Sequence, residues 1–156
     1  MKWPTLRRLA PMGISFFIPS NRVHRNGKPT HMDGWNEFIK AVNVNRYAGN
    51  AREQENVRHV EQWARAAMVQ ARLKPPERRA RLFVTFVEVN RRRDVANVYG
   101  GLKWLLDGLS RPRGTKRRGA GLIVDDSCKW VDVRTAVDYD PARPGVRVVC
   151  EYEGEK

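Results

Sequence analysis

The strongest constraint on the fold is an apolar run at residues 81–89, RLFVTFVEV. Apolar side chains occupy both alternating sets of positions in this run, so a strand formed here has two apolar faces. Strands of that kind are typical of the centre of a sheet. The run therefore predicts a central strand, with other strands beside it and helices packed over it.

Apolar residues at helical spacing precede this run. A first stripe at i, i+3, i+4, i+7 spacing predicts a helix near residues 35–42, with Thr30 as its cap and a break at residues 48–50. A second stripe begins near Ala51 and ends before Pro75, which predicts another helix. We interpret both stripes as core packing.

A third stripe follows the central run. Apolar residues between Val95 and Leu109 recur at helical spacing, which predicts a long helix. Gly100 and Gly101 interrupt it at a cost of roughly 1 kcal/mol each relative to alanine. The glycine pair has two interpretations. Either it lets another backbone or DNA approach closely, or it only adds flexibility.

Three further apolar runs complete the sheet. Residues 14–18, 129–137 and 146–152 predict strands, the last two as a hairpin over residues 138–145, and Asn-Gly at residues 26–27 predicts a hairpin-type turn. The order of elements predicts the α+β class, with a single mixed β-sheet and helices mainly on one face.

The charge balance indicates a polyanionic partner. The chain has 30 Lys and Arg against 17 Asp and Glu, which gives a formal net charge of +13 and a pI near 10.5. Nucleic acid is the leading candidate. A membrane surface ranks well behind, because no expected helix has a clean cationic face. We expect a flexible basic N-terminal arm at residues 1–12, followed by one domain at residues 13–156.

The cysteines and the N-terminus favour a cytoplasmic protein. Cys128 and Cys150 lack metal-site spacing and are too few for a disulfide framework, so we expect two small buried thiols. We expect neither a signal peptide nor a membrane span, because Pro4 and Pro11 interrupt the short apolar positions at the start of the chain.

Acidic residues lie beside basic segments at two points. Asp94 follows three arginines at the start of the third helix, so it is either a cap worth roughly 1 kcal/mol or a metal ligand. Asp125 and Asp126 follow the apolar residues 122–124, either as a common strand ending or as carboxylates whose desolvation a metal would offset. Oxygen ligands without a histidine partner favour Mg²⁺, with Mn²⁺ as the alternative.

Lys103 and Asp107 share one face of the third helix. They are either a surface ion pair worth under about 1 kcal/mol or a catalytic lysine beside an acid. Basic residues of three segments are predicted to bind the nucleic-acid backbone, namely Arg22, Arg25, Lys28, Arg91, Arg92, Arg93, Arg111, Arg113, Lys116, Arg117 and Arg118.

Three motifs in order resemble a known family. They are residues 18–22 (IPSNR) before a basic turn, residues 92–97 (RRDVAN) with Lys103 and residues 106–109 (LDGL), and residues 121–127 (GLIVDDS). Each is weak alone, but their order and spacing resemble the RusA family of Holliday junction resolvases.

This resemblance implies a RusA-like fold and an endodeoxyribonuclease. Such a protein is a homodimer that depends on Mg²⁺ and nicks four-way junctions or related branched DNA by metal-assisted phosphodiester hydrolysis. The residues that the resemblance assigns to the metal and to catalysis are Asp94, Asp125, Asp126 and Lys103, with Asn97 and Asp107 in support.

Two departures from the family pattern leave alternatives open. Ala96 stands where the family often has a second aspartate, and Lys103 lies farther from Asp94 than in shorter members. Either Glu88 or Asp107 completes the site, or the metal is held more weakly, or the protein is a weak or inactive binder of branched nucleic acid. An RNA-binding function ranks third, because few aromatic residues lie in basic stretches.

Overall fold

A computed structural model describes residues 13–115 and 118–154, so the predicted arm at residues 1–12 lies outside the described residues. The chain has mixed α+β content, as predicted. Its elements are β1 (Gly13–Pro19), β2 (Arg22–Val23), β3 (Pro29–Thr30), α1 (Trp35–Val44), α2 (Arg46–Gln70), β4 (Ala80–Glu88), α3 (Val95–Tyr99), α4 (Leu102–Leu109), β5 (Val131–Tyr139) and β6 (Gly145–Tyr152).

Four strands form the main sheet, in the order β1-β6-β4-β5. The predicted central position of β4 is confirmed, because it pairs antiparallel with β6 and parallel with β5. The predicted hairpin of β5 and β6 is wrong, since β4 lies between them. As the strand with two apolar faces, β4 takes a position with a neighbour on each side, and the last two strands pair with it rather than with each other.

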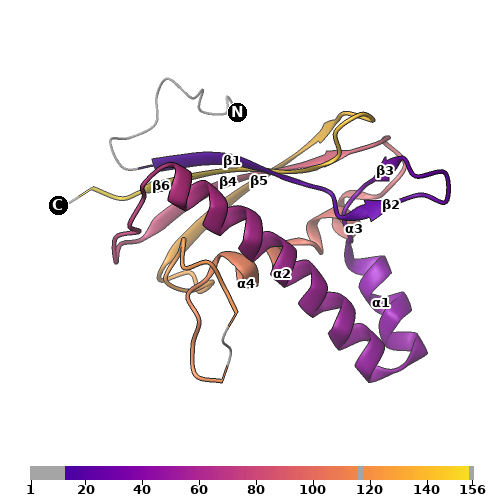
Figure 1. Ribbon diagram of the computed structural model, residues 1–156, viewed down its shortest axis with the longest axis horizontal. Coiled ribbons are helices and arrows are strands. Elements are labelled where there is room, and N and C mark those ends of the chain that lie inside the picture. Colours follow the sequence, from indigo (N-terminus) through magenta and orange to yellow (C-terminus); the bar gives the residue numbers. More distant parts are fainter. Residues whose placement is uncertain (1–12, 116–117, 155–156) are drawn as a thin grey trace.

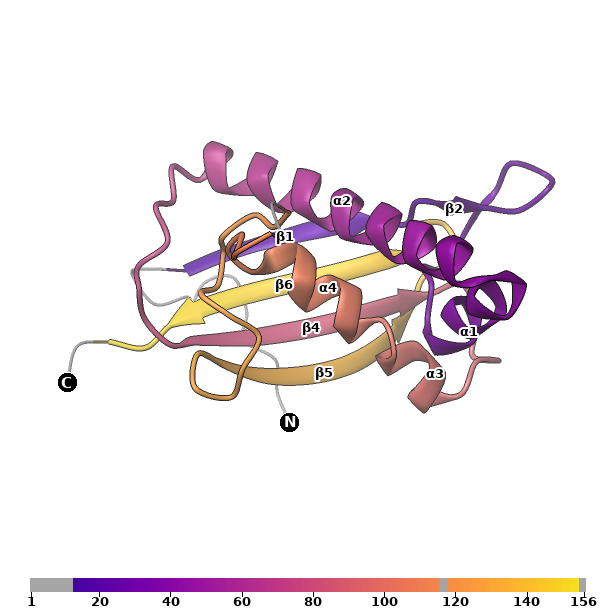
Figure 2. The same ribbon diagram turned by 90° about the horizontal axis from the view of Figure 1, so that it is seen from below.

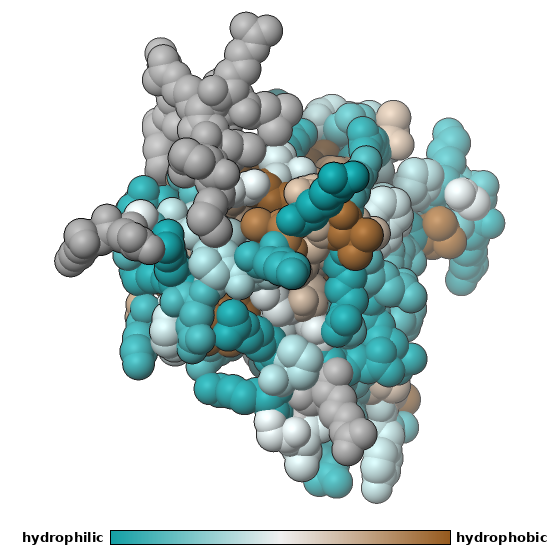
Figure 3. Space-filling view, turned by 60° about the vertical axis from the view of Figure 1, so that its left-hand side comes forward, coloured by the Kyte–Doolittle hydropathy of each residue, from teal (hydrophilic) through white to brown (hydrophobic). Residues whose placement is uncertain are grey.

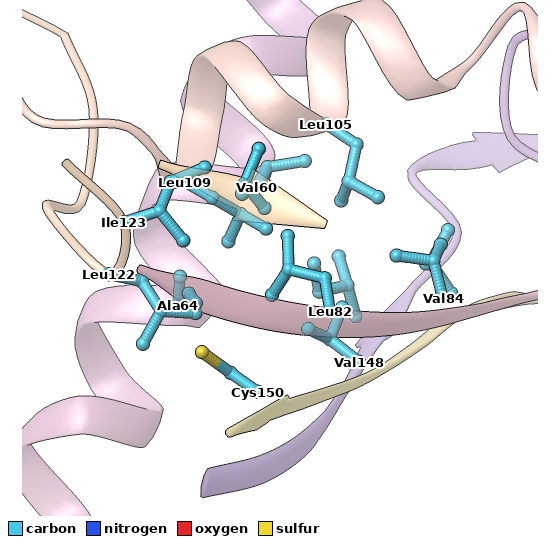
Figure 4. Close-up of a cluster of buried hydrophobic side chains, with 14 of the residues drawn as sticks. Val60, Ala64, Leu82, Val84, Leu105, Leu109, Leu122, Ile123, Val148 and Cys150 are labelled. Carbon is cyan, nitrogen blue, oxygen red and sulfur yellow. The ribbon is translucent and has the colours of Figure 1, made fainter. Parts of the chain in front are cut away.

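The helices lie over one face of the sheet (Figures 1 and 2). Alternate residues of the strands point toward them, so the core forms between the sheet and α2 and α4. Figure 4 shows part of this contact, with side chains from β4 and β6 meeting those of the two helices. Leu82, Val148, Val60 and Leu105 each have 0% exposure there.

The boundaries of the first two helices differ from the predicted ones. Thr30 does not cap α1, because it belongs to β3 and Gly34 precedes the helix. The predicted break at residues 48–50 is also wrong. Asn45 turns the chain and caps α2, its side chain accepting from the Ala48 amide at 2.8 Å. Gly49 lies inside α2, where a Cβ atom would stand 2.5 Å from Val42 Cγ2, so this glycine lets α1 and α2 approach closely.

The two glycines of the third stripe separate α3 from α4. A Cβ atom on Gly100 would lie 2.5 Å from the Cβ of Trp35 and 2.7 Å from its backbone nitrogen. Distances below about 3 Å are not tolerated in packed proteins without movement. Of the two interpretations, the structure therefore supports close approach of another backbone, that of α1.

The remaining expectations concern turns, thiols and membranes. The turn predicted at Asn26 and Gly27 is confirmed, because it joins β2 to β3 and Gly27 has a φ of 80°. Both cysteines are free, but only Cys150 is buried, since Cys128 lies in the exposed turn before β5. No helix in the described part of the chain is long and apolar enough to cross a membrane.

Candidate functional site

A cleft of about 400 Å³ lies between α2, the end of α4 and the segment that follows it. Acidic, basic and hydroxyl side chains surround it together. Its lining consists of Gln54, Val57, Asp107, Ser110, Arg111, Arg113, Thr115, Arg118, Val124, Asp125 and Asp126. Thus three predicted site carboxylates and three predicted cations share one cleft.

Backbone pairing and a buried apolar pair hold the acidic segment in place. The Arg111 amide donates to Ile123 O at 3.1 Å, and the Ile123 amide donates to Leu109 O at 3.2 Å. Leu122 is 0% and Ile123 1% exposed. The run before the acids therefore enters the core as predicted, although it forms an isolated bridge with Ser110 rather than a strand.

Asp125 and Asp126 perturb each other. The hydrogen bond to Asp125 raises the pKa of Asp126, and so do burial and the charges of Asp125 and Asp107. The pKa of Asp125 is lowered by its contact with Asp126, by the Ser127 amide and by the Arg113 guanidinium. Arg113 Nη1 lies 2.7 Å from Asp125 Oδ2. Asp126 therefore gives up its proton less readily than Asp125, because two neighbouring carboxylates repel each other. A bound divalent cation would relieve this repulsion and favour the charged form of both.

Lys103 lies near this cleft but has another partner. Its ammonium is 2.7 Å from Glu53 Oε1 on α2, instead of forming the helical pair with Asp107. The hydrogen bond that Lys103 donates to Glu53 raises the pKa of Lys103, with further contributions from the charges of Glu53, Asp107 and Asp126. The lysine is therefore within electrostatic reach of the acids, although it does not contact them.

Asp94 stands apart from the cleft. Its Oδ1 accepts from the Asn97 amide at 2.8 Å, so it caps α3, the alternative that its position already suggested. Asn97 in turn accepts from the Asn36 amide at 2.8 Å and ties α3 to α1. Asp94 is not among the residues that line the cleft with Asp125 and Asp126.

Two of the predicted DNA-binding arginines are enclosed by acids. Arg93 is 11% exposed and lies 2.7 Å from Glu88 and 3.2 Å from Glu37. Arg22 is 15% exposed and pairs with Asp33. Arg22 and Arg93 are therefore engaged within the protein, and these ion pairs would have to open before either residue could bind DNA as predicted.

The other predicted DNA-binding cations outside the cleft are exposed. Arg25, Lys28 and Arg92 are open to solvent, and Arg91 is exposed while lying over the ring of Tyr139 at 6.0 Å. Hydrophilic side chains cover much of the face seen in Figure 3. Lys116 and Arg117 lie outside the described residues.

Sequence reasoning missed a buried ionic centre around Asp33. This residue is 4% exposed and accepts two hydrogen bonds from Arg52, both at 2.7 Å, and one from Asn56 at 2.9 Å. Arg22 adds two more, at 3.2 and 2.9 Å. The one signal in the sequence was a polar Asn56 beside the apolar stripe of α2.

Glu37 provides a test of the pairing that encloses Arg93. Its interaction with His31, whose Nε2 lies 3.8 Å from Glu37 Oε1, together with the hydrogen bond from the Gly34 amide and the charge of Arg93, outweighs the opposing effect of burial. These interactions lower the pKa of Glu37 from 4.5 to about 2. A lowered folded pKa adds stability above the unfolded pKa and loses it as pH falls through the folded one.

We therefore expect Glu37→Gln to be destabilised relative to wild type by roughly 2–3 kcal/mol at pH 7. This difference should shrink between about pH 4.5 and pH 2. Urea unfolding at several pH values measures it. A difference that stays constant down to pH 2 would contradict the assigned ionisation.

The cleft suits a cation held by few protein ligands. Among the described residues, no group of three or more His, Cys, Asp or Glu side chains is arranged to hold a metal ion. Magnesium, however, is usually bound by one or two carboxylates together with water and substrate phosphates. The adjacent Asp125 and Asp126, with Asp107 nearby, match that donor set, whereas Asp94 does not contribute to it.

The chain is thus an α+β protein with a cleft in which acidic and basic side chains meet. No family model, no curated protein and no solved structure matches the chain.

Proposed function

We propose that this protein is a Mg²⁺-dependent, structure-selective endodeoxyribonuclease that nicks four-way junctions or related branched DNA. The observation that carries the proposal is the cleft in which Asp107, Asp125 and Asp126 lie among arginine side chains. Phosphodiester hydrolysis needs both kinds of charge, because carboxylates hold a divalent cation and guanidinium groups hold the phosphate. The RusA-like order of the sequence motifs supports branched DNA as the substrate.

The residues of the cleft have separate tasks in this proposal. When bound, Mg²⁺ would polarise the scissile phosphate and stabilise negative charge on it. Asp125 and Asp126 would hold the cation, with Asp107 as additional negative charge, and Lys103 would stabilise charge on the phosphate. The ion pair of Arg113 with Asp125 links the two binding steps, because a DNA phosphate that draws Arg113 away frees the carboxylate for the cation.

The alternative is a protein that binds branched nucleic acid without cutting it. Three observations favour it. Ala96 stands in place of an acid, Asp94 acts as a helix cap, and the described residues contain no group of three potential metal ligands. This alternative predicts junction binding that is indifferent to Mg²⁺ and to changes at Asp126.

An assay with two DNA substrates separates these functions. The protein is incubated with a labelled four-way junction and with a matched linear duplex, each with Mg²⁺ and with EDTA. We expect paired, symmetric nicks in the junction only, and none in EDTA. Tight junction binding without nicks in Mg²⁺ or Mn²⁺ would establish the binder, and equal cutting of the linear duplex would contradict structure selectivity.

Paired nicks also require two cleavage sites. A two-fold homodimer, which the RusA resemblance implies, would supply them. Light scattering on the protein alone should then give twice the monomer mass of 18.0 kDa.

A further inference from the structure

A basic hairpin projects from the body of the molecule next to the start of α1 (Figures 1 and 2). It comprises residues 22–30 and is called here the basic finger. Its tip carries His24, Arg25 and Lys28, all exposed, and residues 20–30 contain no acid. No acidic side chain in the described part of the chain pairs with Arg25 or Lys28. The tip therefore presents cationic charge that the protein itself does not neutralise.

The root of the basic finger is rigidly attached to α2. Each of its strands has only two residues, and such a hairpin is marginal by itself in water. Arg22, in its first strand, donates to both Asp33 oxygens and to Glu55 Oε1 at 3.0 Å. Asp33 is in turn held by Arg52 of α2. The network fixes the hairpin where it leaves the core.

Backbone hydrogen bonds close the tip. The His24 amide donates to Lys28 O, and the Gly27 amide donates to His24 O, both at 2.9 Å. The Asn26 side chain accepts from the Lys28 amide at 3.0 Å. Because the conformation is set before any ligand arrives, little conformational entropy is lost on binding.

The basic finger and the cleft lie on opposite sides of α2. The finger is anchored at Arg52 and Asn56, whereas Gln54 and Val57 line the cleft. Each residue of an α-helix is turned by about 100° about the helix axis relative to the one before it. The mean direction of Arg52 and Asn56 from the axis therefore differs by roughly 150° from the mean direction of Gln54 and Val57. A ligand of the finger therefore does not compete for the cleft.

We propose that the basic finger enters the major groove of double-stranded DNA and anchors one arm of the substrate there. A two-stranded ribbon fits the major groove, which is about 12 Å wide, but not the minor groove, which is about 6 Å wide. Arg25 and Lys28 reach the phosphates on either side, and Val23, 68% exposed, faces the apolar edges of the bases. This partner rests on the proposed function, because that function supplies the DNA.

Binding in EDTA tests the basic finger separately from cleavage. Anisotropy of a labelled linear duplex is measured over a range of salt concentrations for wild type and for Arg25→Ala/Lys28→Ala. The matched control is Lys74→Ala/Lys129→Ala, which removes two exposed cations elsewhere. We expect the finger variant to lose about tenfold or more in affinity and its salt slope to fall by about 1.8, from two lost phosphate contacts. The logarithm of the affinity should fall less than half as far in the control variant as in the finger variant.

Three results would overturn the proposal. Equal losses of affinity in the two double variants would show that the basic finger contributes only unspecific positive charge. Displacement of the protein by a minor-groove dye, but not by the major-groove dye methyl green, would exclude the assigned groove. If the finger variant cleaves and binds DNA like the wild type, only the role of the basic finger is contradicted. If binding depends on the basic finger but no variant cleaves DNA, only the proposed nuclease activity is contradicted.

Discussion

Replacing Asp33 with alanine is expected to lower the free energy of unfolding by about 3–5 kcal/mol, the largest stability effect of any single substitution proposed for this protein. The carboxylate is 4% exposed and pairs with both Arg22 and Arg52. Its removal leaves Arg52 without its carboxylate partner and the Asn56 amide with an unmet hydrogen bond, while Arg22 keeps only Glu55 and Asn56. Chemical denaturation at pH 7 measures the loss.

The matched control is Asp132→Ala on the exposed face of β5. Asp132 also lies near two arginines, with Arg81 at 3.6 Å and Arg134 at 3.5 Å, but these are half exposed. Surface pairs of this kind contribute under about 1 kcal/mol. Losses of similar size at Asp33 and Asp132 would contradict the buried network.

The pH dependence gives a second check on Asp33. Burial alone raises the pKa of Asp33, but hydrogen bonds from Arg52 and Asn56 and the charges of Arg22 and Arg52 outweigh it and lower this pKa below 3.8. The difference between wild type and Asp33→Ala should therefore be complete above pH 3.8 and shrink as pH falls through the folded pKa.

Replacing Asp126 with asparagine is expected to reduce junction cleavage at least about a hundredfold. The same change should leave thermal stability equal or higher and DNA affinity equal or higher. The contact with Asp125, burial and the charges of Asp125 and Asp107 all raise the pKa of Asp126, so a neutral side chain at this position relieves repulsion within the cleft and toward phosphate. Loss of activity without loss of stability is typical of a residue kept for function. Single-turnover cleavage, melting and binding in EDTA measure the three quantities.

Asp132→Asn and Asp94→Asn complete this experiment. Asp132→Asn removes an acid outside the cleft and controls for net charge. Asparagine also caps helices well, so Asp94→Asn removes the charge of Asp94 while keeping its structural role. Wild-type cleavage by Asp126→Asn would exclude the cleft as the active site. If Asp94→Asn and Asp126→Asn lose equal cleavage activity, the active site is not complete within one chain. Asp94 of a second copy would then have to contribute to it.

Several site residues could be placed from the sequence alone. The apolar residues before Asp125 and Asp126 predict a segment that enters the core and leaves both acids at its edge, and Leu122 and Ile123 do so. The sequence allowed Asp94 to be either a helix cap or a metal ligand. The hydrogen bond that it accepts from the Asn97 amide supports the cap. These features depend on neighbours within a few residues, which the sequence displays directly.

The grouping of the acids could not be predicted in the same way. Asp107 joins Asp125 and Asp126 because the end of α4 pairs with residue 123, a contact between distant parts of the chain. Asp94 precedes α3 as its cap and does not line the cleft, although the sequence motifs suggested that it would join Asp126.

By itself, the sequence determined the α+β class, the central place of β4 and the strong positive charge. Local apolar patterns and composition are sufficient for these properties. Only the tertiary structure decided which cations remain available, because Arg93 is paired with Glu37, 56 residues away, and Arg22 with Asp33 and Glu55. The physical reason is that a charge is neutralised by whatever side chain folding brings within about 4 Å, and no local pattern encodes that distance.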